Sequence, residues 1–102
     1  LGRLRRRFET GIDCGLFHVF DDAERARYVR SLEEVLSPGS VLHLLCFSDQ
    51  EPPGPGPRRI SEREIGEAFR RTFALVRIEP ARLESRVHAG GARAWLASLT
   101  RL

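Results

Sequence analysis

The segment Gly11–Asp22, GIDCGLFHVFDD, constrains the fold more than any other part of the sequence. Ile12 is the apolar residue near the end of a predicted strand, and the small residues Cys14 and Gly15 break the chain direction after it. Asp21 is a residue type that often begins a helix. A strand that turns sharply into a helix is the repeating unit of open α/β sheets, which bind their ligands beyond the ends of the strands. The segment therefore predicts an α/β fold with a ligand site at this corner.

The residues after the corner predict a long amphipathic helix. Asp21 and Glu24 have the spacing of a capping box, in which each side chain accepts a hydrogen bond from the other residue's amide. We expect this helix to end in a tight turn at Ser37-Pro38-Gly39. Its apolar residues recur on one helical face at Tyr28, Val29, Leu32, Val35 and Leu36.

The run Val41–Phe47 predicts a second strand, because it is apolar except for His43. An apolar run of this kind is typical of a parallel sheet with helices on both faces. We therefore expect His43 to be an interior histidine whose polar atoms are satisfied. With the strand predicted at Phe8–Asp13, this run completes a strand–helix–strand unit.

The later sequence predicts a loop, a short helix and two more strands. Residues Ser48–Arg59 are rich in Pro and Gly, and a loop of this length is often functional. Ser61 and Glu64 then form a second capping box, before a helix that reaches Phe69.

The last third of the sequence predicts a hairpin. Phe73–Ile78 is a strand that we expect to bend at Pro80 and to continue towards Val87. A turn at His88–Gly91 leads to Ala94–Leu99, which we interpret as the returning strand, with a helix as the alternative.

Composition limits the expected partners and compartment. The 17 basic residues are all arginine, but 14 acidic residues are interspersed with them, so the charge predicts a solvated surface without a nucleic-acid or membrane partner. Cys14 and Cys46 suggest no disulfide framework, and with the histidines they lack the spacing of a zinc site, so we expect no metal. The absence of a long apolar run or a signal peptide, together with these cysteines, favours the cytoplasm.

The 102 residues allow one domain at most, and the sequence contains no Met, so we expect the chain to be part of a longer one. The strand that begins at Phe8 would then be an edge strand with unpaired amides. We expect the isolated chain to be marginally stable, or to form a homodimer or another association through this edge.

Residues 8–49 resemble the second half of class I S-adenosylmethionine-dependent methyltransferases, in particular a bacterial group that contains the patterns GLFHVF and LHLLCFSD. The later PRRIS, IEPARLE and AWLASL segments are similar to the same group, so the resemblance covers nearly all of residues 1–102. It implies the carboxyl-terminal portion of a single domain with a three-layer, Rossmann-like α/β fold. The strands would be the fourth to seventh of seven, with the last antiparallel between the two before it.

Two departures from the family pattern are visible. Ser40 replaces the second Gly of a PGG turn, which is tolerable where no positive φ is needed. The Gly-rich loop and the acidic residue that hold the cofactor in the family have no counterpart in these residues. We therefore expect this chain alone to be inactive, and a non-catalytic remnant or interaction module that needs a second chain is the alternative function.

The resemblance implies methyl transfer from S-adenosylmethionine to a small molecule. This reaction needs positioning more than acid or base groups, because the cofactor carries the leaving group. By resemblance, the cofactor-binding residues are Asp13, Cys14, Gly15 and Leu16. A strand-end Asp13 that only binds turn amides is the alternative for that residue.

The residues beyond the corner are candidates for binding the methyl acceptor or for catalysing the transfer to it. His18 is a candidate catalytic base because its pKa lies near physiological pH, with a structural histidine that hydrogen bonds the corner as the alternative. Arg58 is available to an anionic group of the substrate. The predicted substrate-binding residues are Phe17, Phe47, Asp49 and Arg58, and Phe47 has the core as its alternative.

Overall fold

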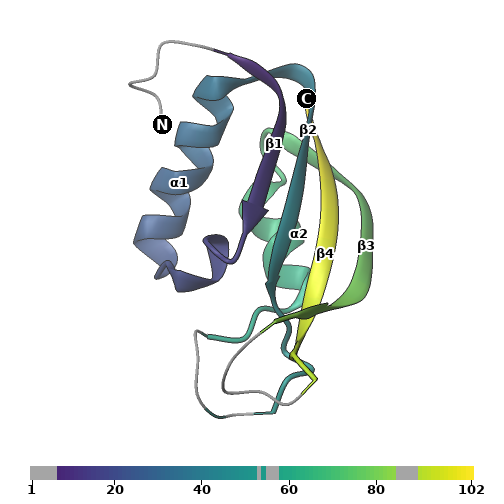
Figure 1. Cartoon of the computed structure of the whole chain (residues 1–102). Helices are drawn as coiled ribbons and strands as arrows, with labels where there is room; N and C mark the ends of the chain where they lie inside the picture. The colour runs from purple at the N-terminus through teal and green to yellow at the C-terminus, as the bar shows by residue number, and fades with distance from the viewer. Residues whose placement is uncertain (1–6, 53, 55–57, 85–89) are drawn as a thin grey trace.

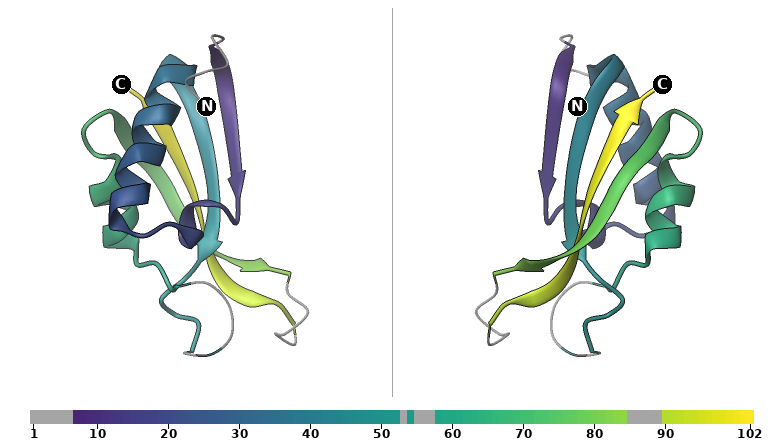
Figure 2. Two further views of the ribbon diagram at one scale, coloured as in Figure 1. Left: turned by 90° about the vertical axis from the view of Figure 1, so that its left-hand side faces the viewer. Right: turned by 90° about the vertical axis from the view of Figure 1, so that its right-hand side faces the viewer.

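The computed structural model describes residues 7–52, 54, 58–84 and 90–102 (Figure 1). They form a four-stranded sheet with two α-helices packed on one of its faces (Figure 2). In chain order the elements are β1 (Phe8–Cys14), the 3₁₀ turn η2 (Phe17–Val19), α1 (Asp22–Val35), β2 (Leu36–Phe47), α2 (Glu62–Phe69), β3 (Phe73–Leu83) and β4 (Ala92–Arg101).

The sheet has the strand order β1-β2-β4-β3. β1 and β2 are parallel, whereas β4 is antiparallel to both β2 and β3. This order confirms the strand–helix–strand unit and the last strand lying between the two before it. It also confirms Ala94–Leu99 as a strand, because this segment pairs with β2 through Leu99 and Ala94.

Both helices begin where the sequence predicts. The Asp21 carboxylate accepts a hydrogen bond from the Glu24 amide at 2.8 Å, and the Glu24 carboxylate accepts one from the Asp21 amide at 3.0 Å. Ser61 and Glu64 make the equivalent pair at α2, at 3.1 and 3.3 Å. Neither helix in the described ranges combines the length and the apolar character that a membrane crossing needs.

The core lies between the two helices and the sheet face that they cover. α1 and α2 contribute one apolar face each, and β2 and β4 contribute every second residue. The buried residues include Val29, Leu32 and Val35 from α1, Leu42, Leu44 and Cys46 from β2, Ile65 and Phe69 from α2, and Trp95, Ala97 and Leu99 from β4.

The prediction that helices cover both faces of β2 is wrong for the described residues. His43 is exposed on the opposite face, where its Nδ1 atom lies 3.2 Å from the hydroxyl of Ser98, so the expectation of an interior histidine is also wrong. Ile12, on the same face, is 79% exposed. The crossovers through α1 and α2 run in the same direction across the sheet, and because such connections are right-handed both helices lie on one face.

The expected turn at Ser37-Pro38-Gly39 belongs instead to the irregular start of β2. α1 ends at Val35, and the register between β1 and β2 shifts between Phe8 and Thr10. Gly39 absorbs the irregularity with a φ of +88°. Ser40 is accommodated because its hydroxyl donates a hydrogen bond of 2.8 Å to the Phe8 carbonyl.

β3 runs through Pro80 as far as Leu83. A proline is tolerated there because β3 is an outer strand of the described sheet. The N–H group that proline lacks can face the unpaired side of the strand, where no hydrogen bond to a neighbouring strand is lost. The predicted continuation to Val87 and the first half of the turn at His88–Gly91 lie outside the described residues.

Candidate functional site

The corner after β1 lies at the margin of the sheet (Figure 1). The Gly15 amide donates a hydrogen bond of 2.9 Å to the Leu45 carbonyl, which ties the corner to β2. Gly15 has a φ of +83°, a conformation that costs any other residue about 1–2 kcal/mol. Cys14 is exposed immediately before it, so the backbone of this corner is open to a ligand.

Asp13 organises the corner from inside. Its carboxylate is 4% exposed and accepts hydrogen bonds from the amides of Leu16 at 2.8 Å and Phe17 at 3.1 Å, and from the Tyr28 hydroxyl at 2.6 Å. Burial, and secondly the hydrogen bond to Asp13, raise the pKa of Tyr28 well above its usual value. These contacts favour the alternative in which Asp13 binds turn amides and positions the corner without touching a ligand.

His18 is held in a similar way. It is 5% exposed, its Nδ1 atom accepts a hydrogen bond of 2.9 Å from the Phe47 amide, and its ring meets the Phe47 ring edge-on. Burial lowers the pKa of His18, against the opposing effects of the Asp13 charge and the Gly15 backbone. The ring is therefore neutral with its proton on Nε2, and its geometry favours the structural alternative.

The two candidate aromatic residues are buried. Phe17 is fully buried and packs against the ring of Phe69, with the centroids 5.4 Å apart. Phe47 is buried beneath the guanidinium of Arg59, which lies 5.2 Å from the ring centroid. Both rings are packed inside the protein behind the corner. The core role that was the alternative for Phe47 therefore fits the structure.

An apolar groove runs beside the corner, between β1 and α1. It has a volume of about 230 Å³, and Ile12, Leu16 and Tyr28 are among its lining residues. Leu16 and Ile12 are both exposed, as is Val19 just beyond the corner. We call this cavity the β1 groove. It lies between the corner and β1, an outer strand that, among the described residues, pairs on one side only.

A second pocket, of about 530 Å³, lies on the other side of the corner and brings two of the predicted residues together. His18, Val19, Phe20, Asp21 and Arg58 line it, and we call it the corner pocket. The exposed Asp49 is not one of these lining residues. The pocket thus combines apolar surface with the cation of Arg58 and the carboxylate of Asp21, which already accepts a hydrogen bond from the Glu24 amide.

Arg25 was not predicted as a site residue, yet it connects the corner to both helices. Its guanidinium lies 4.7 Å from the centroid of the Phe17 ring, and its Nη1 atom lies 3.3 Å from the Glu64 carboxylate. The helical spacing contained the signal, because Arg25 precedes Val29 by four residues and Leu32 by seven, on the apolar face of α1.

The residues that remain available for a cofactor are few. The exposed Cys14 and Leu16 flank Gly15, which has no side chain to hinder close approach. Within the described residues, no group of three or more histidine, cysteine, aspartate or glutamate side chains is arranged to hold a metal ion.

Comparison with known proteins identifies the architecture. No family model matches the sequence. A SAM-dependent methyltransferase from Methanosarcina mazei matches 93% of this chain with a TM-score of 0.78 and 16% identity, over 59% of its own length. A 1,6-didemethyltoxoflavin-N1-methyltransferase from Burkholderia thailandensis, solved with 1,6-didemethyltoxoflavin and S-adenosylhomocysteine, matches 93% with a TM-score of 0.68 and 21% identity, over 44% of its length.

A third similar structure concerns the conversion of a disulfide bond into a thioacetal group during echinomycin biosynthesis. It matches 94% of this chain with a TM-score of 0.76 and 25% identity, over 49% of its length. The chain thus spans about half the length of the solved structures that it matches. Its Rossmann-like fold, including the antiparallel hairpin, is that of part of a class I methyltransferase.

Proposed function

We propose that this chain is the carboxyl-terminal part of a S-adenosylmethionine-dependent methyltransferase that acts on a small molecule. The observation that carries the proposal is the corner at Cys14–Leu16, which is exposed at an outer strand of a methyltransferase-like sheet. The bound S-adenosylhomocysteine of the toxoflavin methyltransferase supports the same cofactor for this chain.

In this proposal the corner forms one wall of the cofactor site. Gly15 allows the cofactor to approach the backbone, and Cys14 and Leu16 contact it on either side. Asp13 positions the corner through the amides of Leu16 and Phe17. The bound cofactor would supply the activated methyl group and its leaving group.

We propose that the acceptor lies in the corner pocket. Val19 provides apolar contact, and Arg58 binds an acidic group of the acceptor. Asp49, from the same loop as Arg58, stays a proposed substrate-binding residue although it does not line the pocket. His18 keeps the pocket wall in place, because its Nδ1 atom is already bonded to the Phe47 amide. Transfer from a sulfonium to an acceptor with a free lone pair needs alignment and exclusion of water, which such a pocket provides.

The cofactor site needs a second wall, which we expect beyond the outer edge of β1. The β1 groove and the exposed Ile12 offer an apolar surface for it, and the open strand offers backbone groups. The chain alone would then be inactive. The second candidate function, an interaction module or homodimer without catalysis, would use the same surface, and the two free cysteines fit a cytoplasmic protein in either case.

Isothermal titration calorimetry with S-adenosylhomocysteine tests the proposal. We expect no binding to the 102-residue chain, and micromolar binding to a polypeptide that also contains the sequence encoded upstream of Leu1. In that longer polypeptide Gly15→Ala should weaken binding. Gly39→Ala is the matched control, since Gly39 also has a positive φ, +88°, but lies away from the corner.

Two results would contradict the proposal. Binding to the 102-residue chain alone would show that no second wall is needed. Failure of the longer polypeptide to bind, while the chain still forms a stable dimer in size-exclusion chromatography, would favour the interaction module.

A further inference from the structure

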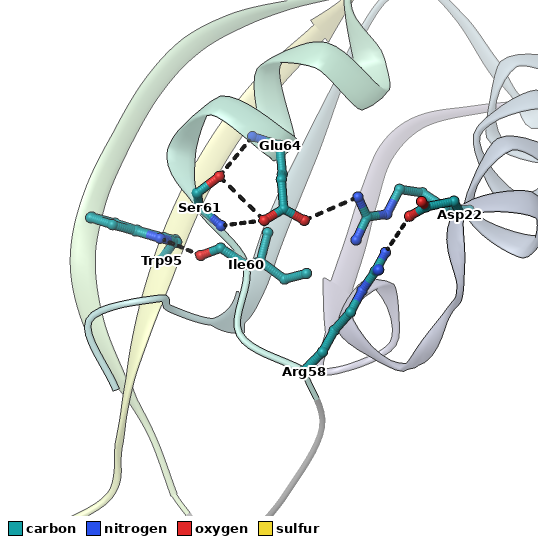
Figure 3. Close-up of polar contacts among 7 residues, drawn as sticks. Asp22, Arg58, Ile60, Ser61, Glu64 and Trp95 are labelled. Atoms are coloured by element: carbon teal, nitrogen blue, oxygen red, sulfur yellow. Dashed lines mark hydrogen bonds and ion pairs between the residues drawn. The ribbon is translucent and has the colours of Figure 1, made fainter. Parts of the chain in front are cut away.

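A third cavity lies between α1 and α2, and it shares Arg58 with the corner pocket. Figure 3 shows polar contacts of the residues around it. The cavity has a volume of about 590 Å³, and we call it the helix groove. Arg25 and Ala26 line it from α1, Glu64 and Ala68 from α2, and Arg58 from the loop. Asp22 from α1 and Glu67 from α2 also line it.

The donors of Arg25 are only partly used. This residue is 9% exposed, and only its Nη1 atom is bonded to a carboxylate, that of Glu64 at 3.3 Å. Its Nε and Nη2 atoms are buried and have no hydrogen-bond partner. These atoms form one edge of the guanidinium, the edge that holds a carboxylate or phosphate with two parallel hydrogen bonds. Leaving charged donors buried without acceptors is costly, which points to a ligand.

Arg58 supplies a second cation at the rim of the helix groove. Its Nη2 atom lies 3.1 Å from the carboxylate of Asp22. A dashed line in Figure 3 marks this ion pair. The Asp22 side chain is 90% exposed, and ion pairs of this kind contribute little net free energy. An anion that enters the groove can therefore replace Asp22 as the partner of Arg58.

The carboxylates of the helix groove are already paired. Glu64 binds Arg25 and also completes the capping box of Ser61. Glu67 forms an ion pair of 3.0 Å with Arg63. The groups in the groove that lack a partner are the Nε and Nη2 donors of Arg25, so the ligand that they bind should be an anion and not a cation.

We propose that the helix groove binds the oxyanion group, a carboxylate or a phosphate, of a small molecule. The free edge of Arg25 holds two of its oxygens, and Arg58 leaves Asp22 to bind the same group. Because Nε and Nη2 are buried in the present arrangement, the ligand can reach them only if neighbouring side chains move. The site shares Arg58 with the corner pocket, but its evidence at Arg25 does not depend on the proposed methyl transfer.

Nuclear magnetic resonance of the arginine Nε–Hε groups of the 102-residue chain tests the site directly. Inorganic phosphate and acetate are titrated separately at constant ionic strength, and Arg25→Lys identifies the Arg25 signal by its loss. We expect a saturable shift of this signal. Tighter binding of phosphate would indicate a phosphate ligand, and tighter binding of acetate would indicate a carboxylate ligand.

Surface variants measure the contribution of each part. Arg58→Gln should weaken binding ~10-fold, the loss of about one charge-assisted hydrogen bond. Asp22→Asn should strengthen binding by up to ~5-fold, because Arg58 no longer has to give up its ion pair with Asp22. Ala26→Leu, which fills the groove without changing its charge, should also weaken binding.

Matched controls separate the site from general charge effects. Arg30→Gln removes an exposed cation from α1, and Ala23→Leu adds bulk to α1, but neither residue lines the helix groove, so both variants should bind as the wild type does. The proposal is overturned if no Nε–Hε signal shifts with saturation. It is also overturned if Arg30→Gln weakens binding as much as Arg58→Gln, or if Asp22→Asn weakens it.

Discussion

Replacing Tyr28 with Phe tests how the corner is held. The Tyr28 hydroxyl donates a hydrogen bond of 2.6 Å to Asp13, whose carboxylate is 4% exposed. The substitution removes this donor and keeps the ring, which packs against Phe20. A hydrogen bond to a charged group contributes about 1.5–3 kcal/mol, and since water can partly reach Tyr28 we expect a loss of about 2 kcal/mol in the free energy of unfolding.

Urea unfolding followed by the fluorescence of Trp95 measures this loss. Trp95 is the only tryptophan and is buried, with its indole nitrogen 2.9 Å from the Ile60 carbonyl. With a slope of about 2 kcal/mol per molar urea, the midpoint should fall by ~1 M at an unchanged slope. Ser31→Ala, which removes another hydroxyl from α1, is the control and should change stability by less than about 0.5 kcal/mol.

A double-mutant cycle with Asp13→Asn identifies the cause. If the hydroxyl acts through the carboxylate, Tyr28→Phe should cost clearly less in the Asp13→Asn background. The reasoning is refuted if Tyr28→Phe lowers stability by less than about 0.5 kcal/mol, or if the two substitutions are additive.

Three further predictions concern pH, the thiols and the open strand. Since burial lowers the pKa of His18 below its usual 6.5, the unfolded chain binds more protons than the folded chain at acidic pH. This contribution to stability is complete above about pH 6.5 and is lost as the pH falls below it. His18→Gln should therefore flatten that loss in urea unfolding, and an unchanged pH dependence would contradict this reasoning. Burial raises the pKa of Cys46 to about 12, so a thiol reagent should modify the exposed Cys14 alone in the folded chain, and rapid reaction of both thiols would contradict the structure. Ile12→Lys should reduce self-association in size-exclusion chromatography at high concentration, and identical elution of both proteins would argue against the β1 edge as the contact.

The positions of the helices were predictable because their determinants are local. The capping boxes at Asp21 and Ser61 depend on residues three positions apart, and the structure shows both. The place of β4 beside β2 was accessible only through the resemblance, because the paired residues are 47 to 59 positions apart.

The predictions that were wrong concern burial, which depends on how the whole sheet is covered. The run Val41–Phe47 alternates between a covered and an open face, but its apolar residues on both faces hide this alternation from the sequence. His43 therefore looked interior although no described helix covers its face.

The sequence predicted the location of the candidate site better than it predicted what each residue does there. The corner at Cys14 and Gly15 is exposed as expected, and His18 and Arg58 share a pocket. Whether Asp13 faces a ligand or the turn amides depends on the path of the backbone over the next four residues, which the residue type alone does not determine.

The position of β4 has a consequence for how this chain folds during synthesis. β4 occupies Ala92–Arg101, yet it forms the bridge between β2 and β3, which do not pair with each other directly. The ribosome must therefore release this segment before β3 has a partner, and until then β2 exposes a long apolar edge. A polypeptide cut before Ala92 would lack the bridge, and we expect it to aggregate instead of forming a smaller version of the same sheet.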